Sequence, residues 1–164
     1  MKWIAMILVC GVLSGCASVH PMRVKLDRDS SELGVKLVLS AWHLAASQGL
    51  FDLYFDSMTD DSIFLGTDET ERWSKDEFMG YAREPFSDGH GWTYVSRGPE
   101  VAFSDDRQTA WVDEVLDHEK YGVLRGTGVL VRSGDEWKIA QYSLTFLVPN
   151  EKASTVVEAI RGED

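Results

Sequence analysis

The pattern of apolar and polar positions changes once along the chain, from helical spacing to strand-like runs. Residues 29–48 place apolar side chains three and four positions apart, as one face of an amphipathic helix requires. Shorter helices are predicted after Gly49 and from Ser74, where Ser74 and Glu77 can form a capping box. Residues 92–148 are instead rich in Val, Ile, Thr and aromatic residues. Helices first and strands second predict an α+β domain in which a curved antiparallel sheet wraps around N-terminal helices.

Turn residues separate the expected elements. Strands are predicted at residues 62–65, 92–97, 101–103, 109–117, 123–132 and 137–148. Residues 59–61 are predicted to turn, Pro85 to end the third helix and Asn150 to cap a last one. A long curved sheet of this kind leaves a cone-shaped space against the helices, where we expect a pocket.

The N-terminal residues follow the order of a secretory signal. Lys2 precedes an almost wholly apolar stretch at residues 3–13, and two small residues then precede Cys16. The apolar stretch is shorter than the roughly 20 residues that a membrane-spanning helix needs. A buried N-terminal helix is the alternative, but such a helix would not end in small residues, a cysteine and a polar stretch.

The run Leu13-Ser14-Gly15-Cys16 resembles the lipobox of bacterial lipoproteins. The resemblance implies cleavage before Cys16, a diacylglyceryl group on its thiol and an acylated amine, and so a stable membrane anchor. Ala17, where inner-membrane lipoproteins carry an aspartate, implies an outer-membrane protein facing the periplasm if the source is Gram-negative. The predicted divisions are a signal peptide at 1–15, the lipidated cysteine and a tether at 16–28, and a single domain at 29–164.

Charge and cysteine usage exclude several classes of protein. A net charge of −11 argues against binding the nucleic-acid backbone. Of the two cysteines, Cys10 leaves with the signal and Cys16 is lipidated, so no thiol remains for a disulfide or a thiolate metal site. The sequence has no His-Glu-x-x-His spacing, no Gly-x-Ser-x-Gly elbow and no phosphate-binding loop. We therefore expect neither a metal nor a cofactor.

Several strings between residues 33 and 151 resemble the SnoaL-like branch of the nuclear transport factor 2-like superfamily. These strings are Phe64-Leu65-Gly66-Thr67-Asp68 and residues 71–78, 91–94, 110–114, 121–130 and 137–142. The resemblance implies a cone-shaped fold and often a dimer. That superfamily includes isomerases, dehydratases, polyketide cyclases and hydrolases as well as binding proteins without activity, so the fold alone does not decide the function.

Asp113 and Glu114 are the first candidates for chemistry. Adjacent strand residues point to opposite faces, so only one of the two can face the pocket. A carboxylate in an apolar cone can act as a general base, because burial raises its pKa towards neutrality. We assign this role to Asp113 and a ligand contact to Glu114. The alternative is a structural ion pair with Arg125 on the neighbouring strand.

Tyr142 is the candidate partner of that base. Steroid-isomerase-like members of the superfamily pair an acidic base with a phenol that stabilises an oxyanion, which makes Tyr142 a candidate catalytic residue by resemblance. The alternative is a core tyrosine with a satisfied hydroxyl.

Three further residues are candidates for ligand binding. Trp92 and Trp111 are predicted to line an apolar pocket. Arg125 opens the run Arg125-Gly126-Thr127-Gly128, where it either grips a substrate carboxylate or pairs with the acidic residues. The glycines leave room for a ligand or for close packing.

Three functions remain open from the sequence. The first is an envelope lipoprotein that binds a small, partly apolar molecule in its cone without turning it over. The second is a cofactor-free enzyme of the isomerase, dehydratase or cyclase type, with a carboxylate base. The third is a dimeric assembly module of the envelope. The expected partners are the membrane through Cys16, an unidentified small molecule and a second copy of the chain, and no nucleic acid.

Overall fold

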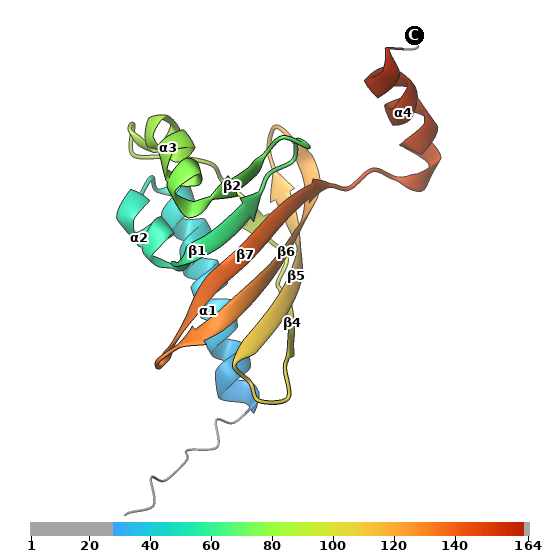
Figure 1. Cartoon of the computed structure of the whole chain (residues 1–164). Helices are drawn as coiled ribbons and strands as arrows, with labels where there is room; N and C mark the ends of the chain where they lie inside the picture. The colour runs from blue at the N-terminus through green and yellow to red at the C-terminus, as the bar shows by residue number, and fades with distance from the viewer. Residues whose placement is uncertain (1–27, 163–164) are drawn as a thin grey trace, which may run out of the picture.

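The computed structural model describes residues 28–162, with the first three helices gathered on one side of a curved sheet (Figure 1). The predicted signal peptide and Cys16 lie outside the described residues. The elements in chain order are α1 (Arg28–Ser47), α2 (Phe51–Asp56), β1 (Met58–Leu65), β2 (Arg72–Ser74), α3 (Lys75–Phe86), β3 (Val95–Ser96), β4 (Glu100–Phe103), β5 (Thr109–His118), β6 (Gly122–Ser133), β7 (Glu136–Phe146), a 3₁₀ turn η1 (Asn150–Lys152) and α4 (Ala153–Arg161).

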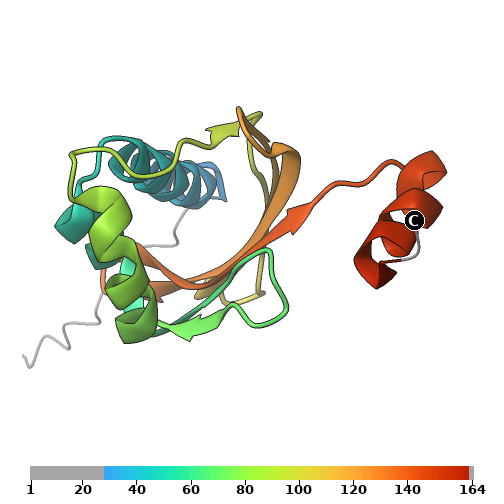
Figure 2. The ribbon, with the colours of Figure 1, turned by 90° about the horizontal axis from the view of Figure 1, so that it is seen from above.

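The sheet is mixed rather than wholly antiparallel. Its strand order is β2-β1-β7-β6-β5-β3, and β4 pairs with β5 beside β3. The pairs of β5, β6 and β7 are antiparallel hairpin neighbours, as the sequence predicts, but β1 and β7 run in parallel. No hairpin joins β1 to β7, so nothing in the local sequence specifies the direction of this pair. Figure 2 shows the sheet curving around α1.

Helix α1 fills the concave side of the sheet. Its apolar face buries Val35, Leu39, Trp42, Ala45 and Ala46, which are the positions that helical spacing predicts. The interior is unusually aromatic, because Tyr54, Phe55, Phe64, Phe78 and Phe86 pack against this face and against one another. The space between the buried face of α1 and the sheet is therefore filled largely by aromatic side chains.

Gly49 lies just after the end of α1 and packs closely against the segment that follows α3. Its φ of +63° is the left-handed conformation typical of a helix C-terminus, and the N–H of Leu50 donates to the carbonyl of Ala45 at 2.9 Å. A side chain at Gly49 would lie 2.6 Å from the backbone N of His90. The N–H of Gly91 also donates to the carbonyl of Ala46 at 3.0 Å. The segment leading into β3 is thus held against the end of α1.

Several boundaries differ from the sequence prediction. Strand β2 was not predicted, and the strand expected at residues 92–97 forms only at Val95–Ser96. Asn150 was predicted to cap the last helix, but it lies in η1 and no side chain caps α4. Residues 59–61 belong to β1, whose pairing with β7 is irregular between Met58 and Ile63. Pro85 lies inside the last turn of α3, which continues to Phe86. The N–H that proline lacks would bond to the carbonyl of Tyr81, so α3 loses this hydrogen bond and ends one residue later. The capping box of Ser74 and Glu77 is confirmed at the start of α3.

The C-terminal helix α4 stands apart from the sheet and the other helices (Figures 1 and 2). None of its residues is buried, and Ile160 is 80% exposed. Within residues 28–162, the helices are too short or too polar for any of them to cross a membrane.

Candidate functional site

Two glycines of β6 make room for a buried tyrosine of β7. Gly128 is paired with Tyr142 in the sheet, and Gly126 is paired with Glu114 of β5 on its other side. A side chain at Gly126 would lie 2.6 Å from Cζ of Tyr142, and one at Gly128 would lie 2.9 Å from its Cδ2. The Gly-x-Gly run therefore seats the Tyr142 ring, which is fully buried, and aims its hydroxyl at β5.

Glu114 is a buried carboxylate with three side-chain hydrogen-bond donors around it. The residue is only 2% exposed. Its Oε1 accepts a hydrogen bond from the Tyr142 hydroxyl at 2.6 Å and lies 2.9 Å from Nε2 of His43 on α1. Its Oε2 accepts from the hydroxyl of Ser96 on β3 at 2.5 Å. Side chains from α1, β3, β5 and β7 thus meet in one cluster, which we call the Glu114 cluster.

The neighbours of Glu114 lower its pKa by more than burial raises it. Burial raises the pKa of Glu114, but the hydrogen bond and charge of His43 and the hydroxyls of Ser96 and Tyr142 lower it below its ordinary value. Burial, followed by the charge of Glu114, raises the pKa of Tyr142 well above its ordinary range. At neutral pH the carboxylate is ionised and Tyr142 is a neutral donor. His43 must then carry a proton on Nε2 to donate to the carboxylate.

A groove of about 600 Å³ runs beside α1 and reaches this cluster. We call it the α1 groove. His43, Ser96 and Glu114 line it together with residues 36–47 of α1 and the segment 93–99. Nδ1 of His43 makes no hydrogen bond within the described part of the chain. An imidazole whose other nitrogen is held by a buried carboxylate can accept and return a proton.

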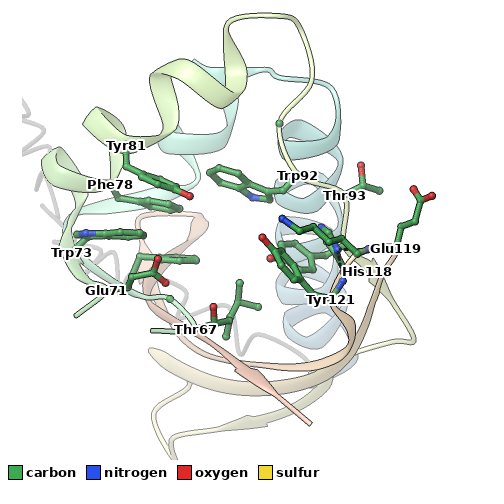
Figure 3. Close-up of a pocket in the computed structure, with 16 residues that line it drawn as sticks. Thr67, Glu71, Trp73, Phe78, Tyr81, Trp92, Thr93, His118, Glu119 and Tyr121 are labelled. Atoms are coloured by element: carbon green, nitrogen blue, oxygen red, sulfur yellow. Dashed lines mark hydrogen bonds between the residues drawn. The ribbon is translucent and has the colours of Figure 1, made fainter. Parts of the chain in front are cut away.

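A second cavity of about 390 Å³ opens between α3, the β1–β2 loop and the β5–β6 turn (Figure 3). We call it the aromatic cleft. Its aromatic lining residues are Phe64, Trp73, Phe78, Tyr81, Trp92, Tyr94, His118 and Tyr121. Tyr94 also lines the α1 groove, so it separates the two cavities. The Glu114 cluster lies on the α1-groove side of Tyr94 and does not line the aromatic cleft.

Several rings of the aromatic cleft lie nearly parallel. Trp73 stacks on Tyr81 at 4.7 Å and 24°, and Phe78 stacks on Trp92 at 5.7 Å and 17°. Such rings present apolar surface to a ligand wherever a face or edge is not covered by the neighbouring ring. The hydroxyls of Tyr81, Tyr94 and Tyr121 form no hydrogen bond among residues 28–162. These three hydroxyls are available to a bound molecule.

Comparison with known proteins agrees with this fold. The sequence profile of the SnoaL-like domain matches residues 35–149. The chain belongs to the SnoaL-like domain family. No curated protein matches the chain.

Solved structures share the fold of this SnoaL-like domain at low sequence identity. An NTF2-like protein of unknown function from Pseudomonas putida KT2440 is 11% identical, with a TM-score of 0.62 over 76% of this chain and 92% of that one. A "putative dehydratase from the NTF2-like family" of Streptomyces avermitilis is 15% identical, with a TM-score of 0.62 over 75% and 100% of the two chains. A "putative aromatic ring hydroxylase" of Novosphingobium aromaticivorans is 16% identical, with a TM-score of 0.60 over 75% and 93%. Identities this low show the fold alone.

In the SnoaL-like domain, Asp113 and Glu114 point to the opposite faces of the sheet from those that our prediction requires. Asp113 is exposed on the outer face of β5, whereas Glu114 faces the interior. Strand alternation requires this result once Val112 and Leu116 are buried. Asp113 therefore cannot be the pocket base that we predicted, and the inward carboxylate is Glu114.

Two other predicted ligand residues also lie on the outer face. Trp111 is 50% exposed. Arg125 is exposed opposite Val115, on the face away from the buried carboxylate and outside the lining of both cavities. Within residues 28–162 it forms no ion pair with Asp113 or Glu114. Trp92 lines the aromatic cleft, and Tyr142 contacts the buried acid. The functions of these residues stay predictions.

The site residues predicted from the sequence do not include His43 or Ser96. They also do not include the glutamate and the tyrosines that line the aromatic cleft. His43 follows buried Leu39 by four positions and precedes buried Ala46 by three, so helical spacing already placed it at the edge of the buried face. No comparable signal identifies Ser96, which depends on the short pair of β3 with β5. Within the described part of the chain, no group of three or more His, Cys, Asp and Glu side chains can hold a metal ion.

Proposed function

We propose that this chain is an envelope lipoprotein, anchored through Cys16, whose SnoaL-like domain binds a small, partly apolar molecule in the aromatic cleft. The anchor rests on the lipobox sequence. The binding function rests on one observation, the open cavity walled by stacked aromatic rings with three free phenol hydroxyls.

The dimensions and chemistry of the cleft support a small ligand. Its volume of about 390 Å³ lies within the usual range of ligand pockets, roughly 300–1,000 Å³. Apolar walls with a few polar groups at fixed places are typical of such pockets, because the walls supply affinity and the polar groups orient the ligand. The hydroxyls of Tyr81, Tyr94 and Tyr121 and the carboxylate of Glu71 are the polar groups here.

A fluorescence titration with matched variants tests the proposal. The full chain in detergent is titrated with a panel of aromatic, sterol and fatty-acid probes, with tryptophan emission as the signal. Tyr81 is 52% exposed at the mouth of the cleft, so Tyr81→Ala should fold normally and weaken binding about tenfold. Trp111→Ala removes an aromatic side chain from the outer face and should leave affinity unchanged. Equal affinities of the two variants, or no binding by any probe, would refute a binding role for the cleft.

The Glu114 cluster supports a second candidate, a cofactor-free enzyme of the isomerase, dehydratase or cyclase type. In this function the neutral form of His43, with its proton on Nε2, takes a proton from a carbon acid in the α1 groove on Nδ1 and returns it. Glu114 does not react but holds the imidazole in the productive tautomer, and it is a positioning residue. The base then differs from Asp113, our first assignment.

Turnover of a panel of carbonyl compounds with acidic α-protons tests this alternative. His43→Asn should abolish turnover, and Glu114→Gln should reduce it about 10²-fold or more. Asp113→Asn, a charge loss on the outer face, should have no effect. Turnover that survives in His43→Asn would exclude this mechanism.

A further inference from the structure

One acidic side chain projects into the aromatic cleft from the β1–β2 loop. Glu71 lines the cavity near Thr67 and faces the wall that carries Trp92 and Tyr121 (Figure 3). Its Oε2 accepts the N–H of Asp68 at 3.2 Å. A side chain at Gly66 would lie 2.9 Å from Cδ of Glu71, so the glycine makes room for this carboxylate beside the cleft.

This carboxylate has no cationic partner among the described residues. The ion pairs of residues 28–162 involve other acids, and Glu71 accepts only a backbone N–H. It is partly buried, so its negative charge is less screened by water than that of an exposed glutamate. An unpaired acid in an aromatic cavity favours a cation in that cavity.

The surrounding tyrosines respond to the same charge. Burial and then the charge of Glu71 raise the pKa of Tyr81. Burial raises the pKa of Tyr94 to about 12, with smaller effects from Tyr121, Tyr81 and Glu71. These phenols and the carboxylate line the same cavity. At neutral pH the phenols are uncharged, and their rings present negative faces.

Other charges at the cleft come from the β5–β6 turn. Glu119 points away from the cavity in Figure 3. Nζ of Lys120 lies 5.0 Å from the centroid of the Tyr121 ring, so that ring already attracts a cation. Burial lowers the pKa of His118, whose Nδ1 accepts the N–H groups of Lys120 and Tyr121, and a neutral imidazole results. Of the three charged residues that line the cleft, Glu71 is partly buried, whereas Glu119 and Lys120 are exposed.

We propose that the ligand of the aromatic cleft carries a cationic group, a substituted ammonium attached to a compact apolar body. The ammonium lies between Glu71 and the faces of Trp73, Tyr81 and Trp92, and the apolar body fills the rest of the cavity. Aromatic rings bind ammonium groups through their quadrupoles, and a nearby carboxylate adds a direct charge attraction. This inference rests on the proposed binding function and names the chemistry of its ligand.

Three probes of similar size and different charge test the inference. Phenyltrimethylammonium, tert-butylbenzene and benzoate are titrated separately into the full chain in detergent, with tryptophan emission as the signal. The cation should bind about tenfold more tightly than the neutral probe and more tightly still than the anion.

Matched variants assign the preference to Glu71. Glu71→Gln should weaken binding of the cation about tenfold and leave tert-butylbenzene unaffected. Glu69→Gln removes the same charge from the same loop outside the cleft lining and should change neither affinity. Lys120→Ala removes a competing positive charge and should strengthen cation binding about twofold. This variant keeps the test valid if Glu71→Gln folds poorly.

The outcomes separate the two proposals. Equal binding of the cation and the neutral probe, or equal losses in the Glu71 and Glu69 variants, would overturn the cationic ligand and leave the cleft as a binding site. Tighter binding of benzoate, lost in Lys120→Ala, would assign an anionic ligand and also overturn the inference. Failure of all three probes would overturn it as well, and the Tyr81 and Trp111 titrations then decide the binding function separately.

Discussion

At the scale of single residues, the least expected feature is an ionised carboxylate buried without a lysine or arginine. Glu114 is stabilised by two hydroxyls and an imidazole, and these three donors compensate for the water that burial removes. Each donor comes from a different element, so the cluster joins α1 and β3 to the middle of the sheet. Its contribution to stability should follow the ionisation of Glu114.

Glu114→Gln should destabilise the protein in a pH-dependent way. The folded pKa of Glu114 is below its ordinary value of 4.5, so its stabilising effect is present above that value and is lost as the pH falls through the folded pKa. At pH 7 the variant should lose about 2–4 kcal/mol, because donors are left without a charged acceptor. Below about pH 4 the difference from the unmodified chain should shrink. Urea unfolding at several pH values measures it, with Glu119→Gln as the exposed control; a difference that stays constant with pH would contradict an ionised Glu114.

Gly126→Ala should destabilise the protein by about 1–3 kcal/mol, because the new methyl group overlaps the buried ring of Tyr142. Gly80→Ala is the control. Nothing lies within 4 Å of that position in α3, so alanine should stabilise the helix by about 0.5–1 kcal/mol. Thermal unfolding compares the two. Similar effects of both substitutions would show that β6 does not need its glycine.

The orientation of β5 was partly predictable from its own residues. Positions 110, 112 and 116 share a face with Glu114 and are all apolar and buried. Positions 113 and 117 on the other face are aspartates, but Trp111 and Val115 on that same face obscure the pattern. Local alternation therefore favours Glu114 as the inward acid, whereas the identity of its donors requires the tertiary packing of α1 and β3.

At the scale of elements, the helices and strands with strong local sequence signals were predicted correctly, whereas the pairing of strands far apart in the chain was not. The first helix, its end at Gly49, the capping box of α3 and the three long strands all follow from local sequence. The parallel pair of β1 and β7 joins residues far apart in the chain, and no turn residue encodes it. The aromatic cleft depends on that pair, because β1 carries the loop that holds Glu71.

Ser74→Ala should destabilise the protein by about 1 kcal/mol, since α3 loses the side chain that caps its first turn. The effect should also reach the cleft, because the same turn positions Trp73 and Phe78. Chemical denaturation measures the loss, and Ser87→Ala at the exposed C-terminal end of α3 is the control. Equal losses in both variants would argue against a special contribution of the cap.

At the scale of the whole molecule, the two faces of the sheet carry different sets of residues. The concave face holds the aromatic core, the Glu114 cluster and both cavities, while the outer face exposes Trp111, Val123 and the predicted site residues Asp113 and Arg125. An exposed tryptophan on an open sheet face is typical of an interface. We therefore retain the homodimer as a prediction and place its contact on this face.

Trp111→Glu should convert the dimer into a monomer, because a charged side chain replaces an apolar one at the contact. Sedimentation velocity of the full chain in detergent measures the change, and ligand binding in the cleft should persist. Thr127 of β6 is exposed on the same face and pairs with Asp113, so Thr127→Glu should act in the same direction. An unmodified chain that is monomeric at high concentration would refute the dimer.

The central claim is that the aromatic cleft holds a small molecule, and native mass spectrometry tests it most directly. The full chain is released gently from membranes and compared with its Tyr81→Ala and Trp111→Ala variants. The account predicts one retained extra mass in the unmodified chain and in Trp111→Ala, and its loss in Tyr81→Ala. A chain that carries no extra mass, or a mass retained equally in both variants, would contradict a ligand in the aromatic cleft.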